Sequence, residues 1–159
     1  MYNERFYVGY RWFDHKKIEP MFPFGQGLSY TAFKYKTPAV SKGEDKTGRN
    51  ARWTVSVQVT NAGKVPGREI VQLYASYPRS SVERCVRELK GFAKTKLLKP
   101  GESETVKIPL TARDLAYFDD FSHRFTTPAG TYELSVGSSS RDLRGKVTVA
   151  TDKTVQFAD

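Results

Sequence analysis

The sequence predicts an all-β protein, an antiparallel β-sandwich preceded by an irregular N-terminal arm rich in aromatic residues. Three observations support this fold class. Apolar and polar residues alternate with a period of two in several short segments, turn-forming Gly, Pro and Asn residues separate these segments, and no helical period extends over a useful length. With 159 residues, of which 38% are hydrophobic, the chain can form one domain with a full core and an arm.

The aromatic stretch of the arm covers residues 7–33. It contains eight aromatic residues, three glycines and two prolines. Because each ring buries about 150 Å² or more when it docks, such a segment cannot be a solvated tail. Its Pro and Gly spacing disfavours regular structure. We therefore expect an irregular ribbon whose rings attach it to a neighbouring surface.

One strand, a loop and a second strand are expected after the arm. Residues 32–35 begin a strand with Phe33 and Tyr35 on one face. Residues 36–50 are polar and contain two glycines, which predicts a loop. Residues 51–61 give the clearest strand signal, because apolar residues alternate with polar ones along the whole segment. The apolar residues of that segment are Trp53, Val55, Val57 and Val59.

Two further strands and a tight turn follow. Residues 68–77 form the next strand, with alternate apolar residues directed inward. Residues 88–98 form another, in which Gly91 indicates a β-bulge or a close backbone approach. Residues 99–102 read Lys-Pro-Gly-Glu, a pattern typical of a type II turn because glycine tolerates the positive φ of its third position.

The last third of the chain repeats the pattern of short strands and turns. Residues 104–110 alternate again, 111–115 predict one short helical turn, and 116–125 predict an aromatic, acidic turn. The last strands are expected at residues 131–137 and 144–149. About seven short strands without a long helix are typical of an antiparallel β-sandwich.

Composition and charge exclude several classes of function. The formal net charge is +9, but the basic residues are dispersed and form no recognised nucleic-acid-binding motif, so nucleic acid is not expected as a partner. A cationic face could still meet an acidic polymer such as pectin or lignin. No run approaches the ~20 apolar residues of a membrane span, so no membrane partner is expected. The single Cys85 permits no intramolecular disulfide, and without a signal-peptide pattern the sequence leaves the localisation unknown.

Six segments of the chain are similar, in the same order, to one protein family. They are VGYRWFD (8–14), PMFPFGQGLSYTAF (20–33), PGREIVQLYASYP (66–78), VRELKGFAK (86–94), LLKPGESETVKIPL (97–110) and AGTYELSVGSSSRD (129–142). Together they resemble the C-terminal end of a β-glucosidase of glycoside hydrolase family 3. The resemblance implies a fibronectin type III-like β-sandwich at residues 29–150, a linker arm from the catalytic body at 1–28 and a tail at 151–159.

The resemblance also implies that this chain is not catalytic. The family's barrel, with its nucleophilic aspartate, and its α/β-sandwich body, with the acid/base glutamate, have no counterpart here. Glycoside hydrolysis needs two carboxyl groups that face each other across the bond, about 5–5.5 Å apart in retaining enzymes. The adjacent Asp119 and Asp120 would point apart, and Glu102 and Glu104 would face solvent. We therefore expect no catalytic residues.

No cofactor or metal is expected either. His15 and His123 lie far apart in the sequence, and neither has a neighbouring ligand at metal-binding spacing. Cys85 lacks a nucleophile signature and is expected to be an inert thiol.

The first functional hypothesis is a non-catalytic accessory module that stabilises or positions the catalytic domains of its parent glycosidase. Its docking residues would lie in the arm, with Arg11 and Asp14 paired, whereas Phe22, Phe24, Leu28 and Tyr30 would cap the sandwich. The expected docking residues are Tyr10, Arg11, Trp12, Phe13 and Asp14.

The second hypothesis is weak binding of plant cell-wall polysaccharide or lignin, by stacking on exposed rings beside basic side chains. The candidate rings are Tyr74, Tyr77, Tyr117, Phe118, Phe121 and Phe125. A third hypothesis, a protein-interaction module, rests on fold analogy alone.

Overall fold

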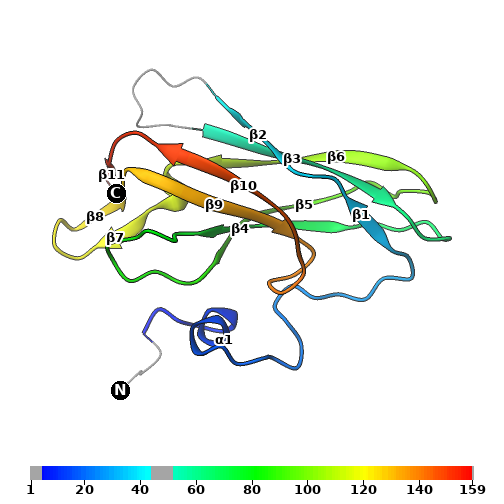
Figure 1. Ribbon diagram of the computed structural model, residues 1–159, viewed down its shortest axis with the longest axis horizontal. Helices are drawn as coiled ribbons and strands as arrows, with labels where there is room; N and C mark the ends of the chain where they lie inside the picture. Colours follow the sequence, from blue (N-terminus) through cyan, green and yellow to red (C-terminus); the bar gives the residue numbers. More distant parts are fainter. Residues whose placement is uncertain (1–4, 44–51, 159) are drawn as a thin grey trace.

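The computed structural model describes residues 5–43 and 52–158 and has the predicted all-β architecture, two antiparallel sheets packed face to face (Figure 1). In the first sheet, β3 (Arg52–Asn61) pairs with β1 (Phe33–Tyr35) and β2 (Ala39–Lys42) along one edge. Along its other edge β3 pairs with β6 (Ser103–Thr111). The 51–61 alternation thus forms the central strand of this sheet.

The second sheet has the strand order β10-β9-β4-β5. Its strands are β4 (Ile70–Ser76), β5 (Glu88–Lys94), β9 (Gly130–Gly137) and β10 (Leu143–Thr151). The register between β4 and β5 shifts opposite Gly91, and a Cβ at Gly91 would lie 2.7 Å from the Ile108 side chain of the facing sheet. The bulge predicted at Gly91 is confirmed, whereas the group that approaches Gly91 closely is the side chain of Ile108 and not the backbone of another segment.

The core lies between the two sheets. Period-two alternation directs the apolar side chains of β3 inward, where Trp53, Val55 and Val57 lie opposite Leu110, Ile108 and Val106 of β6. Side chains of β4 and β9 close the core from the other sheet. They include Val71, Leu73, Leu134 and Val136, which are all fully buried.

A third, small sheet covers one end of the sandwich, the end at which the C-terminus lies (Figure 1). Its strands are β7 (Tyr117–Asp119), β8 (Arg124–Thr127) and β11 (Val155–Phe157), in the order β11-β8-β7, and the short 3-10 helix η1 (Arg113–Leu115) precedes them. Residues 116–125, predicted to be a turn, therefore supply strand residues to the hairpin β7–β8. β11 lies within the range predicted as a tail. This segment forms a strand because pairing with β8 satisfies its backbone hydrogen-bonding groups.

Two other expectations are corrected. The range 36–50, predicted to be a loop, contains the strand β2, which pairs with β3. The rest of that prediction, from residue 44 onward, lies outside the described residues. The arm is not entirely irregular, because it contains the helix α1 (Tyr10–Lys16), which ends at Lys17 in the left-handed conformation. A helix of 7 residues is too short to persist in water alone, so contacts with the sandwich must stabilise it.

Candidate functional site

The arm lies on the outer face of the second sheet, the face turned away from the core (Figure 1). Tyr10 of α1 makes the main apolar contact. Its ring stacks on Phe24 with a centroid distance of 4.7 Å and meets the edge of Tyr74 at 6.1 Å. Its hydroxyl accepts a hydrogen bond of 2.8 Å from the backbone N–H of Leu89. Tyr10 therefore faces the sandwich of its own chain.

Asp14 attaches the C-terminal half of α1 to the same sheet. Its carboxylate lies 3.0 Å from Nε of Arg87 and 3.1 Å from a guanidinium nitrogen of Arg141, and its side chain is almost completely buried. Burial raises the pKa of Asp14 above its usual value, although the two arginines act in the opposite direction. The predicted pairing of Arg11 with Asp14 is wrong: Arg11 instead lies 3.8 Å from Glu88.

The remaining expected docking residues are half-buried. Arg11, Trp12 and Phe13 each retain some exposed surface, and Nζ of Lys16 lies 4.8 Å from the centre of the Trp12 ring. The helix thus has one side against the sheet, through Tyr10 and Asp14, and another side that is only partly covered.

The second half of the arm is exposed, against the expectation that it caps the sandwich. Four apolar side chains retain 77% or more of their full exposed area, and we call them the arm patch: Met21, Phe22, Leu28 and Tyr30. Among the described residues, Phe24 alone of the predicted cap makes an aromatic contact, with Tyr10 of α1. The segment is held by its backbone: the carbonyl of Gly25 accepts a hydrogen bond of 3.0 Å from the side-chain amide of Gln72, and the carbonyl of Phe24 accepts one of 2.9 Å from the N–H of Ser140.

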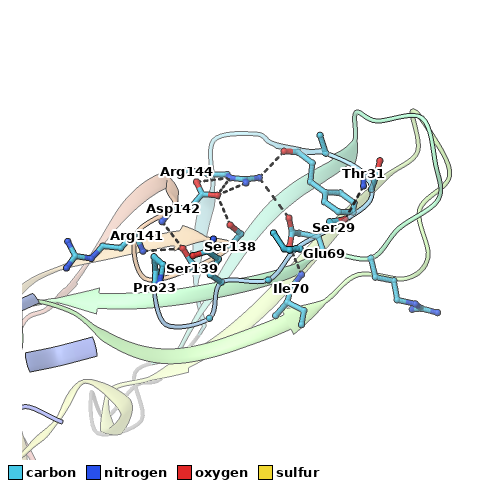
Figure 2. Close-up of a pocket in the computed structure, with 17 residues that line it drawn as sticks. Pro23, Ser29, Thr31, Glu69, Ile70, Ser138, Ser139, Arg141, Asp142 and Arg144 are labelled. Carbon is cyan, nitrogen blue, oxygen red and sulfur yellow. Dashed lines mark hydrogen bonds and ion pairs between the residues drawn. The ribbon is translucent and has the colours of Figure 1, made fainter. Parts of the chain in front are cut away.

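A groove of about 630 Å³ lies beside the arm patch, between the arm and the loop after β9 (Figure 2). Arg144 crosses it and binds Asp142 at 2.6 and 3.0 Å, the backbone carbonyl of Phe33 at 2.9 Å and, more distantly, Glu69 at 4.0 Å. Hydrogen bonds from Arg144 hold the pKa of Asp142 below its usual value, whereas burial raises the pKa of Glu69. The polar groups of the groove therefore largely satisfy one another.

Most of the candidate polymer-binding rings are covered. Tyr74 faces away from the core, as its strand position predicts, but it is fully buried under α1, so the expectation that it is accessible is wrong. Tyr77 is half-buried, packs edge-on against Tyr132 and donates a hydrogen bond of 2.9 Å to Glu88. Tyr74 therefore cannot stack on a polymer, and the guanidinium of Arg84 lies over the Tyr77 ring, 3.5 Å from its centre.

The remaining four rings of this set are three phenylalanines around the β7–β8 hairpin and Tyr117, which is half-buried. Phe121 is 95% exposed and Phe118 is 44% exposed. Phe125 is partly covered, since the edge of Phe118 meets it at 5.4 Å and Arg113 lies over its ring at 5.3 Å. We call the two accessible rings, Phe118 on β7 and Phe121 in the turn that follows it, the hairpin tip.

No catalytic or metal-binding arrangement is found among residues 5–43 and 52–158. In these ranges no three His, Cys, Asp or Glu residues gather as metal ligands, and no helix is long and apolar enough to cross a membrane. Burial raises the pKa of Cys85 to about 11, which keeps its thiol protonated and unreactive near neutral pH.

Sequence reasoning missed one group of charged residues, which surrounds Glu88 at the start of β5. Lys90 lies 3.1 Å and Arg84 3.5 Å from its carboxylate, in addition to Arg11 at 3.8 Å. Burial raises the pKa of Glu88. The opposing effects of Lys90, Tyr77 and Arg84 are together larger, so the pKa of Glu88 lies below its usual value. The only sequence signal was the density of basic residues in RCVRELK (84–90).

Comparison with known proteins gives a consistent result. The family model of the fibronectin type III-like domain matches residues 69–140. The chain is 44% identical over 156 residues to thermostable beta-glucosidase B of Acetivibrio thermocellus. The matched region covers 98% of this chain and 20% of that protein. It is also 44% identical over 147 residues to beta-glucosidase BoGH3A of Bacteroides ovatus, over 92% of this chain and 19% of that protein.

Solved structures show the same relationship. Beta-glucosidase 3B of Thermotoga neapolitana, in complex with glucose, superposes with a TM-score of 0.88 at 38% identity, over 99% of this chain and 21% of that chain. The beta-glucosidase of Kluyveromyces marxianus, in complex with glucose, gives a TM-score of 0.89 at 37% identity, over 98% and 18% respectively. The chain therefore spans about a fifth of the length of the relatives it matches.

Proposed function

Since this chain is a fibronectin type III-like domain of the β-glucosidases of glycoside hydrolase family 3, and not their catalytic domain, we propose that it is an accessory module that stabilises and positions the catalytic domains of its parent enzyme. The parent's substrate would be a β-glucoside, as the names of the relatives indicate. The module itself would contribute binding surface and stability, and no catalytic group.

The observation that carries this proposal is the exposure of the arm patch. Leu28 and Tyr30 are fully exposed and Met21 and Phe22 nearly so, although all four belong to one short segment beside a folded β-sheet. A set of large apolar side chains exposed in one segment marks an interaction surface. The larger part of each relative lies outside the matched region and offers a partner for it.

The proposed docking surface differs from the one expected from the sequence. Tyr10 and Asp14 hold α1 on the sandwich, so they would act indirectly by positioning the arm. The partly exposed Trp12 would contact the catalytic domains together with the arm patch. Covering these side chains would add hydrophobic stabilisation at roughly 25 cal/mol per Å² of apolar surface.

A chimera tests this role. The chain would replace the matched 156 residues of the Acetivibrio thermocellus enzyme, with and without the double substitution Leu28→Ser and Tyr30→Ser. We expect the double substitution to lower the thermal midpoint of the chimera by several degrees, because the apolar contact is lost, and to leave the midpoint of the separate 159-residue chain nearly unchanged.

The matched control is Phe121→Ser, since Phe121 is equally exposed but lies at the β7–β8 tip, away from the arm. It should change neither midpoint. Equal midpoints for the chimera with and without the arm-patch substitutions would reject the docking surface.

A second candidate function, binding of cell-wall polysaccharide or lignin, is favoured only by the exposed tip formed by Phe118 and Phe121. We expect any retention on lignin to fall when both are changed to serine, because the accessible rings are removed. Pull-down on cellulose, xylan and lignin, with and without salt, measures this. Absence of depletion on all three, or retention that persists without the two rings, would reject the tip as a polymer site.

A further inference from the structure

The surface around α1 carries more positive than negative charge, in three neighbouring groups of ion pairs centred on Glu88, Asp14 and Glu83. Four carboxylates there meet six basic side chains within 4.0 Å. We call this set the α1 charge network. Its acidic members are Asp14, Glu19, Glu83 and Glu88, and its basic members are Arg5, Arg11, Arg84, Arg87, Lys90 and Arg141.

The surplus of positive charge is concentrated around Glu88. One carboxylate there faces Arg11, Arg84 and Lys90, and the side chains of Arg84 and Lys90 are only 7% and 15% exposed. Burial lowers the pKa of Lys90, and Arg84 and Arg11 contribute in the same direction. Arg11 is the most accessible of the three, at 35% exposure, and it projects from α1. An additional carboxylate could therefore reach the group through Arg11.

Covering such a group with a neutral surface is unfavourable. Removing ionised groups from water costs several kcal/mol per ion unless opposite charges and hydrogen bonds replace the solvent. In the separate domain, solvent and dissolved salt at the exposed edge of the network screen its surplus positive charge. If the catalytic domains cover this side of the arm, their contact surface must supply the missing negative charge.

We propose that the α1 charge network is an electrostatic contact for acidic side chains on the catalytic part of the parent enzyme, with Arg11 as the accessible cation. This inference rests on the proposed docking function and names the chemistry of the partner surface. The first described residues support this placement, because Arg5 lies 3.4 Å from Glu83 and the hydroxyl of Tyr7 donates to the same carboxylate at 2.9 Å. The described part of the chain therefore begins next to the network.

The test compares Arg11→Gln in two settings, the separate chain and the chimera described above. In the separate chain the substitution leaves Glu88 with two cations, so the midpoint should move by no more than about 2–4 °C, the equivalent of about 1 kcal/mol for a chain of this size. In the chimera the midpoint should fall further, because the partner's carboxylates lose their counter-charge.

Salt provides an independent measurement. Between 0.1 and 1 M salt the screening length shortens from about 10 Å to about 3 Å. The difference between the wild-type and Arg11→Gln chimeras should therefore shrink as NaCl is added. The control is Arg124→Gln, which makes the same chemical change at an exposed position of β8 and should have no effect specific to the chimera.

The outcomes separate this inference from the proposed function. A chimera destabilised by the Leu28 and Tyr30 substitutions but not by Arg11→Gln would retain the docking role and overturn the acidic partner. An equal effect of Arg11→Gln in both settings, or a difference that salt does not change, would also overturn it. If neither set of substitutions affects the chimera, the docking function itself is wrong.

Discussion

Individual residues determine how the arm and the loops are held. Asp142 is one such residue, because it receives hydrogen bonds from Arg144 at 2.6 and 3.0 Å and from the hydroxyl of Ser138 at 2.6 Å (Figure 2). Arg144 also binds the backbone of Phe33 at the start of β1, so this one ion pair connects the loop after β9 to the end of the arm.

We expect Asp142→Asn to lower the free energy of unfolding by about 1–2 kcal/mol at pH 7, since it removes a charge-assisted hydrogen-bonded pair at a half-exposed site. Hydrogen bonds from Arg144 lower the pKa of Asp142 in the folded protein. Its stabilisation is therefore complete above the unfolded pKa of about 3.9 and is lost as the pH falls through the folded value.

Urea unfolding at pH 7 and near pH 2.5 measures this effect. The difference between wild type and Asp142→Asn should be smaller at the lower pH. Asp152→Asn is the control, because its pair with Lys42 at 3.7 Å is largely exposed and should contribute little. A difference that stays constant with pH would show that the carboxylate charge at position 142 is not what stabilises the loop.

At the scale of elements, the relation between α1 and the second sheet decides which surface remains free. The helix is short and lacks a side-chain N-cap hydrogen bond, so its stability depends on Tyr10 and Asp14. Because these two residues face the sheet, the following segment leaves the arm patch outside. Docking of α1 and exposure of the patch are thus consequences of one arrangement.

We expect Tyr10→Ala to lower the free energy of unfolding of the separate chain by about 3 kcal/mol, because the contacts with Phe24 and Tyr74 are lost. Tyr10→Phe should cost only about 1 kcal/mol, the contribution of the hydrogen bond from Leu89. Tyr30→Ala is the matched control and should be neutral, since that ring is fully exposed. Urea denaturation measures all three, and a neutral Tyr10→Ala would mean that α1 does not stabilise the separate domain.

At the scale of the whole molecule, the distribution of charge and apolar surface distinguishes the two ends of the sandwich. The β7–β8 hairpin presents the exposed Phe121 at the end near the C-terminus. The arm, which lies along the outer face of the second sheet, carries its own apolar patch and part of the α1 charge network. Part of the net charge of +9 is therefore concentrated where the proposed partner would bind.

Local patterns predicted most of the sandwich, but they missed β2, the strands of the β7–β8 hairpin and the form of the arm. Alternation placed Trp53, Val55 and Val57 in the core, and the Pro-Gly pair gave the turn at Gly101, whose φ is +79°. The same local information could not show that Leu28 is exposed or that α1 is helical. No periodic pattern encodes those outcomes, since they depend on which surface the arm contacts.

By itself, the sequence determined the all-β class, the order of most strands and the inward residues, because alternation and turn chemistry act between residues close in the chain. Only the tertiary structure decided that Tyr74 is buried, that Asp14 pairs with Arg87 and Arg141, and that the arm patch is free. These contacts join residues far apart in sequence. Their geometry depends on the packing of α1 against a completed sheet, which no local pattern contains.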